Sequence, residues 1–185
     1  MSGDFKTIDS ESIFKGVIVD LSIDTIESPS GRIMKREVIK HMDAVGIVAI
    51  NANNQIVLVR QYRHAVGKNL LEIPAGLLDL DGETPESCAK RELQEETGYV
   101  AESVERISEF YTSVGFANEK VYLYYTDSIV PGEHAREADE EGMRVEEIDL
   151  QEAVAMSKRG EIEDSKTLIA LLLASQRYEN LGANQ

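Results

Sequence analysis

"RELQEETG", at residues 91–98, places three glutamates within five positions and then stops at a glycine. In a helix, Glu92 lies three and four residues from Glu95 and Glu96, so the carboxylates share one face and repel by about 0.2–0.5 kcal/mol per pair. Gly98 is a natural helix terminator, which puts Glu95 and Glu96 in the last turn, where the helix dipole disfavours anions. The crowding predicts a positively charged partner that the sequence itself does not supply.

The composition of the chain limits which positively charged group can lie beside these acids and which molecules the protein can bind. At 185 residues, 42% of them hydrophobic, the chain predicts one domain with an ordinary core. With 34 acidic and 19 basic residues, the chain has a formal charge of −15. This charge argues against a broad basic surface that binds nucleic acid or an anionic membrane. Cys88 is the single cysteine, which excludes an internal disulfide framework, and we expect it to be a small buried side chain rather than a reactive thiol.

The first residues, "MSGDFKTIDSESIF", lack the basic and apolar regions of a signal peptide, and no apolar run approaches the roughly 20 residues that span a bilayer. We therefore expect a cytoplasmic protein that binds no membrane.

Apolar periodicity and turn residues predict an α+β protein. A helix begins at the capping residue Thr84 with Pro85 in its first position, and Ala89 and Leu93 form its apolar stripe. Residues 13–27 and 33–41 are expected to form a hairpin, and residues 44–50 and 55–62 a second one about "NANN". The other strands are expected at 70–76, 104–112, 120–129 and 144–148, and two further helices at 150–160 and 165–178. Strands on either side of an internal helix favour a mixed α+β sandwich.

The crowded acids have two readings from the residues alone. A solvated helix face is the ordinary one, but Glu83, one turn before the helix, and the loop Pro74-Ala75-Gly76 converge on the same end. Carboxylates, main-chain carbonyls and waters are the ligands of Mg²⁺ or Mn²⁺, whereas zinc would call for His or Cys. An EF-hand in "DLDGE" fails on spacing, because Gly82 in sixth place would put Leu77 first and Cys88 twelfth.

The stretch "GLLDLDGETPESCAKRELQEETGY", from Gly76 to Tyr99, resembles the signature of the Nudix hydrolases. That signature is a glycine, five residues, a glutamate, seven residues, then Arg-Glu-apolar-x-Glu-Glu-x-Gly-apolar. The charged half matches throughout, at Glu83, Arg91, Glu92, Leu93, Glu95, Glu96, Gly98 and Tyr99. Six residues rather than five separate Gly76 from Glu83, and we expect the "DLDG" loop to absorb the extra one.

Outside the signature, "VRQYRHAV", "LEIPAGLLD" and "RGEIEDSKTLIAL" are similar to the branch that includes the ADP-ribose pyrophosphatases, a likeness from about residue 36 to residue 175. The resemblance implies a Nudix-like α/β/α sandwich with a mixed sheet and an N-terminal β-hairpin extension. The expected divisions are the extension at 1–41, the Nudix domain at 42–178 and a frayed tail at 179–185. Where this branch commonly has Ser-Pro-Gly, the chain has Ser113-Val114-Gly115, so a substrate such as GDP-mannose stays open.

The resemblance also assigns metal ligands. Glu92 and Glu96 are expected to hold the metals directly, with Glu95 assisting in binding and catalysis and the Ala75 carbonyl supplying a further oxygen. Arg91 is expected to pair with Glu83 and so to steady the site, the alternative being an exposed ion pair of little value.

Five further residues are candidates for binding the substrate or activating the water. Arg63 is expected to bind the diphosphate, while Arg60 has either the same task or a structural one at the surface. Glu119 closes the site or merely begins a strand. Glu140 or Glu141, which the sequence does not separate, is expected to activate water, although a charge run in a loop is ordinarily just solvated.

Three functions follow as hypotheses. The first is Mg²⁺-dependent hydrolysis of the diphosphate linkage of ADP-ribose, or of a related nucleoside diphosphate sugar, to AMP and ribose 5-phosphate. The second is a non-catalytic nucleotide-binding regulatory module, and the third is a Nudix pyrophosphatase of other specificity. In this branch the N-terminal segment commonly exchanges between subunits, so we also expect a homodimer.

Overall fold

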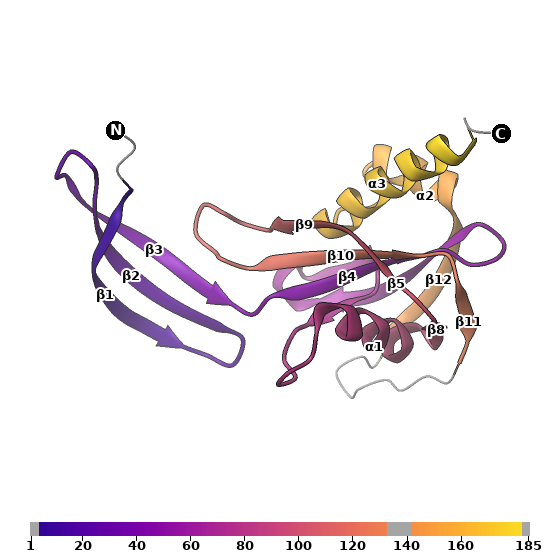
Figure 1. Cartoon of the computed structure of the whole chain (residues 1–185), viewed down its shortest axis with the longest axis horizontal. Helices are drawn as coiled ribbons and strands as arrows, with labels where there is room; N and C mark the ends of the chain where they lie inside the picture. The colour runs from indigo at the N-terminus through magenta and orange to yellow at the C-terminus, as the bar shows by residue number, and fades with distance from the viewer. Residues whose placement is uncertain (1–3, 133–141, 183–185) are drawn as a thin grey trace. The chain divides into compact units, whose positions relative to one another are not determined.

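The computed structural model describes residues 4–132 and 142–182 (Figure 1), with side chains as far as residue 178. The chain forms two compact units, and each is described by itself. The first comprises Met1–Asp43 and Phe110–Lys120, and the second comprises Ala44–Glu109 and Val121–Gln185.

The strands are β1 (Lys6–Lys15), β2 (Val19–Glu27), β3 (Ile33–His41), β4 (Ala44–Ala49), β5 (Gln55–Arg63), β6 (Lys68–Glu72), β7 (Ala75–Leu77), β8 (Tyr99–Ala101), β9 (Glu105–Tyr111), β10 (Lys120–Thr126), β11 (Ile129–Pro131) and β12 (Arg144–Asp149). The helices are the 3-10 turn η1 (His64–Val66), α1 (Pro85–Thr97), α2 (Leu150–Lys158) and α3 (Ser165–Gly182).

The first unit contains an antiparallel sheet in the order β1-β2-β3. The hairpin of β2 and β3 is confirmed, with Glu27 opposite Ile33. The prediction of one strand over residues 13–27 is wrong, because a turn at Gly16 separates β1 from β2. The Gly16 N–H donates to the Val19 carbonyl at 2.9 Å, and a Cβ on Gly16 would lie 2.7 Å from the Phe14 ring. Apolar residues alternate on both sides of this turn, so the sequence pattern does not reveal it.

The second unit is built on two main sheets, ordered β7-β4-β10-β9 and β12-β5-β6. The first of these is mixed, since β4 runs parallel to β10 and antiparallel to β7. The predicted hairpin of residues 44–50 and 55–62 is therefore wrong: β4 and β5 belong to different sheets, and the bridge between Ile50 and Ile56 marks the corner. Every residue of β4 is buried, so its sequence carries no alternation from which a partner strand could be predicted.

The single strand predicted at residues 70–76 is also divided, into β6 and β7. Pro74 stands between them, and proline has no N–H to give to a strand ladder. Its carbonyl instead accepts a hydrogen bond from Ile47 N–H on β4 at 3.0 Å. The break at Pro74 passes the chain from one sheet of the second unit to the other.

Helix α1 has the ends that the sequence predicts. Thr84 accepts a hydrogen bond from the Ser87 N–H at 3.2 Å, and Pro85 occupies the first turn. Gly98 has φ of 74° and donates to the Gln94 carbonyl at 2.8 Å, a left-handed conformation that glycine adopts at little cost.

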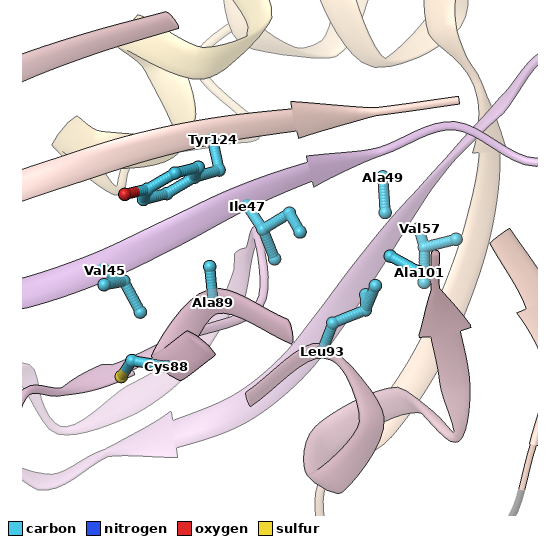
Figure 2. Close-up of a cluster of buried hydrophobic side chains, with 9 residues drawn as sticks. All are labelled: Val45, Ile47, Ala49, Val57, Cys88, Ala89, Leu93, Ala101 and Tyr124. Carbon is cyan, nitrogen blue, oxygen red and sulfur yellow. The ribbon is translucent and has the colours of Figure 1, made fainter. Parts of the chain in front are cut away.

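The helices cover the sheets of the second unit from opposite sides. In Figure 1, α1 lies on one side of β4 and β10, and α2 and α3 lie on the other. Figure 2 shows the apolar cluster between α1 and the neighbouring strands, formed by Val45, Ile47, Ala49, Val57, Cys88, Ala89, Leu93, Ala101 and Tyr124. Helix α3 reaches Gly182, past the predicted end at Tyr178. The arrangement is the α+β sandwich that the sequence predicts. None of the helices in the described part of the chain has the length and hydropathy needed to cross a membrane.

Candidate active site

The acidic face of α1 points inward, beside its apolar stripe. Glu92 and Glu96 are only 8% and 4% exposed, and they are buried along with the core residues Cys88, Ala89 and Leu93 on the same helix. Because a carboxylate loses its hydration when it is buried, these two side chains need partners that a solvated helix face would not need. A solvated face is therefore the wrong description of Glu92 and Glu96.

Strand β7 supplies the wall against which these carboxylates lie. A Cβ placed on Gly76 would be 2.0 Å from the Cδ of Glu92, so only glycine leaves room for this carboxylate. The Ala75 N–H donates to Oε2 of Glu96 at 3.0 Å. The backbone of Ala75 and Gly76 thus lies directly against two of the crowded glutamates.

Arg91 is the cation at the centre of the cluster. Its Nε and Nη2 donate to the two carboxylate oxygens of Glu83 at 2.9 and 3.0 Å, and its Nη1 lies 2.8 Å from Glu95 Oε2 and 2.8 Å from Glu92 Oε1. The hydrogen bonds to Glu83 raise the pKa of Arg91 and lower the pKa of Glu83. Arg91 therefore joins three of the four glutamates, including the predicted partner Glu83.

In this cluster the acidic side chains outnumber the arginine. Glu83, Glu92, Glu95 and Asp79 all lie within 4 Å of the one guanidinium of Arg91, and Glu96 lies on the same helix face. All the side-chain donors are oxygens, which suit a hard divalent cation. Within residues 4–132 and 142–182, no group of three or more Asp, Glu, His or Cys side chains is arranged so that it could hold a metal ion. The cluster fits a divalent cation in donor chemistry and charge, with Glu92 and Glu95 turned toward Arg91 in the present arrangement.

Cys88 lies against this cluster, where its Sγ accepts a hydrogen bond from Nη2 of Arg91 at 3.4 Å. Its thiol is buried and donates to the Leu77 carbonyl at 3.3 Å. Burial raises the pKa of Cys88 to about 12, which leaves it protonated and unreactive at neutral pH. The prediction of a small buried side chain is confirmed.

The two candidate arginines of β5 lie in different surroundings. Arg63 donates from Nε and Nη2 to Glu72 at 2.7 Å each, and its side chain is 40% exposed. Its pKa is raised first by the hydrogen bonds to Glu72 and then by nearby charges, of which Glu96 is one. Arg60 pairs instead with Glu146 on β12, with Nε 2.5 Å from Oε1. Arg63 is thus close to the acidic cluster, whereas Arg60 pairs with β12, on the other side of β5 in the same sheet.

For three predicted residues the structure gives no position relative to this cluster. Glu119 belongs to the first unit, where it accepts from the Thr112 hydroxyl at 2.6 Å and lies 3.5 Å from His41. Glu140 and Glu141 lie outside the described residues.

Sequence reasoning gave no role to Glu72, which is 1% exposed and is bound by Arg63 and by Lys166 on α3. The available signal was a lone acid within the apolar run Leu70-Leu71-Glu72-Ile73. An acid in a buried strand requires a cationic partner, but the strand does not say where in the chain that partner lies.

Comparisons with known proteins identify the family of the chain. The model of the family described as NUDIX domain matches residues 40–171. The chain belongs to this family. The prediction of a Nudix hydrolase is confirmed, and the family's enzymes generally need a divalent metal.

The relatives carry several names. The chain is 41% identical over 90% of each chain to "ADP-ribose pyrophosphatase" of Bacillus subtilis (strain 168). It is 45% identical, over the same shares, to "Methanol dehydrogenase activator" of Bacillus methanolicus. A "GDP-mannose pyrophosphatase" of Enterobacter sp. (strain 638) is 39% identical over 74% of this chain and 75% of that one. A solved structure titled "Crystal structure of ADP compounds hydrolase" has a TM-score of 0.87 at 19% identity, covers 97% of both chains and confirms the fold.

Replacing Gly76 with alanine tests the cluster as a cation site. The added Cβ must displace the Glu92 carboxylate, so we expect the affinity for Mn²⁺ to fall by about tenfold or more. Electron paramagnetic resonance of free Mn²⁺ during a titration measures it, with circular dichroism to establish folding. Gly115→Ala is the matched control, because a Cβ there meets no heavy atom within 4 Å. Equal Mn²⁺ affinity in wild type and Gly76→Ala would contradict the assignment.

Proposed function

We propose that this chain hydrolyses the diphosphate linkage of ADP-ribose to AMP and ribose 5-phosphate, with Mg²⁺ or Mn²⁺ as cofactor. The observation that carries the proposal is the convergence of the buried carboxylates of Glu92 and Glu96 on the backbone of Ala75 and Gly76. A substrate with two negative phosphates would be repelled by these acids alone, and only a bound cation makes them an anchor for it. The relatives named ADP-ribose pyrophosphatase support this substrate.

The proposed roles follow from placement and chemistry. Glu92 and Glu96 would hold the cation, with Glu95 assisting and the Ala75 carbonyl as a further ligand. When bound, the cation neutralises phosphate oxygens that gain charge during the reaction. Arg91 holds Glu83, Glu92 and Glu95 in place. It is a positioning residue rather than a contact of the substrate.

The reaction needs three events at the substrate. The oxygen of a water molecule forms a bond to one phosphorus, the bond from that phosphorus to the bridging oxygen breaks, and the bridging oxygen leaves with the other phosphate. We assign the proton of the attacking water to Glu140 or Glu141, on the strength of the resemblance. Arg63 has an exposed guanidinium close to Glu96, which supports a role in binding the diphosphate. Arg60 and Glu119 remain proposals as substrate contacts.

Hydrolysis of ADP-ribose by the purified chain is the direct assay. We expect AMP to accumulate with Mg²⁺ and not with EDTA, and Glu96→Gln to lower kcat/KM at least about a hundredfold, because it removes a charged ligand. Glu86→Gln is the control on the same helix, since the Glu86 side chain is 57% exposed and lies 3.3 Å from Lys90 rather than in the acidic cluster.

The same assay separates the alternatives. Faster hydrolysis of GDP-mannose than of ADP-ribose would support a Nudix pyrophosphatase of other specificity. Binding of nucleotide sugars without hydrolysis of any of them would support a regulatory module. A second candidate function, activation of a methanol dehydrogenase, is favoured by the 45% identity to the methanol dehydrogenase activator. Adding the chain to a methanol dehydrogenase and following the rate of methanol oxidation tests it.

We also propose a cytoplasmic homodimer in which residues 1–41 form the dimerisation segment and residues 42–178 the Nudix domain. The single cysteine suits a reducing compartment. The sheet β1-β2-β3 leaves large apolar side chains exposed, which is typical of an interface. These are Phe5, Ile8, Ile13, Phe14, Val17, Ile18 and Ile33.

Light scattering of the full chain tests the dimer. We expect twice the mass of 20.6 kDa, and a shift toward the monomer for Ile8→Asp, because a charge in an apolar interface is costly. Asp9→Ser on the same strand is the control. A wild-type monomer would refute the dimer.

A further inference from the structure

The Glu72 carboxylate is charged and almost completely buried. It is 1% exposed, and it accepts hydrogen bonds from Nε and Nη2 of Arg63 at 2.7 Å each and from Nζ of Lys166. Burial alone would raise the pKa of Glu72, but the bonds to Arg63 and the charge of Lys166 outweigh it and lower the pKa. Glu72 therefore stays ionised between a cation from β5 and a cation from α3.

The next residue of the chain is tied to the same end of α3. The Ile73 N–H donates to the Thr167 hydroxyl oxygen at 2.9 Å, and that hydroxyl donates to Asp164 at 2.5 Å. Thr167 is fully buried, and Asp164 also lies 3.0 Å from Lys166 Nζ. Two consecutive residues of α3 thus hold two consecutive residues at the end of β6.

The following two residues are held from elsewhere in the unit. The Pro74 carbonyl accepts from Ile47 N–H at 3.0 Å, and the Ala75 N–H donates to Glu96 at 3.0 Å. Every residue from Glu72 to Ala75 therefore has a defined partner. Glu72 and Ile73 are bound by α3, Pro74 by β4 and Ala75 by α1. The peptide of Ala75 is consequently placed by the start of α3 as well as by α1.

We propose that Glu72, together with Lys166 and Thr167, is a positioning unit that fixes the direction of Arg63 and the place of the Ala75 peptide in the candidate active site. The proposal rests on the proposed function for what Arg63 and Ala75 do. Glu72 is buried behind Arg63, so it acts through that arginine and contacts no substrate.

The chemistry of the pair supports positioning over simple stabilisation. A carboxylate that receives two parallel N–H bonds fixes the plane of a guanidinium, which one bond or an apolar contact does not. The bonds to Glu72 use one N–H of Nε and one of Nη2 in Arg63, so both N–H groups of Nη1 and the second one of Nη2 are left for an anion. Since apolar residues often replace a buried ion pair at no loss of stability, stability alone gives little reason for ionised groups here.

Two variants separate the two tasks of this unit. Glu72→Gln removes the fork that orients Arg63, so we expect KM for ADP-ribose to rise about tenfold or more with Mn²⁺ affinity within about twofold of wild type. Thr167→Val frees the Ile73 N–H and loosens the segment before Ala75, so we expect Mn²⁺ affinity to fall about tenfold. Both are measured below the melting temperature of each variant, so that a loss of stability alone would change neither constant.

Lys68→Met is the matched control, because Lys68 and Glu163 make a 2.5 Å ion pair between neighbouring segments, with both side chains about half exposed. KM and Mn²⁺ affinity in this variant should stay within about twofold of wild type. Either of two results overturns the positioning role. One is that the wild type is active and Glu72→Gln has the same KM for ADP-ribose; the other is that Thr167→Val has the same Mn²⁺ affinity as the wild type. An inactive wild type would instead overturn the proposed function, and the Mn²⁺ affinity of Thr167→Val would still decide the positioning role. Thr167→Val also carries the test if Glu72→Gln does not fold.

Discussion

Repulsion among carboxylates on the buried side of α1 is the constraint on which the rest of this site depends. Glu92 and Glu96 are nearly removed from water, where like charges repel more strongly than they do on a surface. The local structure responds in three ways: Gly76 leaves space, the Ala75 N–H donates a hydrogen bond, and Arg91 brings one positive charge. The acids still outnumber Arg91, and a divalent cation would reduce the repulsion among them.

The surroundings of the acidic face are held from several parts of the second unit. The segment from Glu72 to Ala75 turns from one sheet to the other at Pro74, and its polar groups are bound by α3, β4 and α1. Buried ionic groups are a costly way to stabilise a core, but they are specific in direction. A hydrolase that must place phosphate oxygens accurately gains from that specificity, since small misplacements lower rates strongly.

The sequence predicted the features that depend on neighbouring residues. The cap at Thr84, the end at Gly98 and the shared face of Glu92 and Glu96 all follow from helical spacing, and the structure has each of them. The predicted hairpin of β4 and β5 failed because strand partners depend on the whole sheet. Glu72 was missed for the same reason, since Lys166 lies 94 residues further along the chain and no local pattern announces it.

Calorimetric titration of Mg²⁺ into the wild-type chain, with a non-hydrolysable ADP-ribose analogue present, tests the central claim most directly. If the acids of α1 hold the cation, Mg²⁺ binding is saturable. Glu96→Gln then lowers the Mg²⁺ affinity by about tenfold or more, and Glu86→Gln leaves it unchanged. An absence of saturable uptake by the wild type, or equal uptake by the wild type and Glu96→Gln, would contradict it.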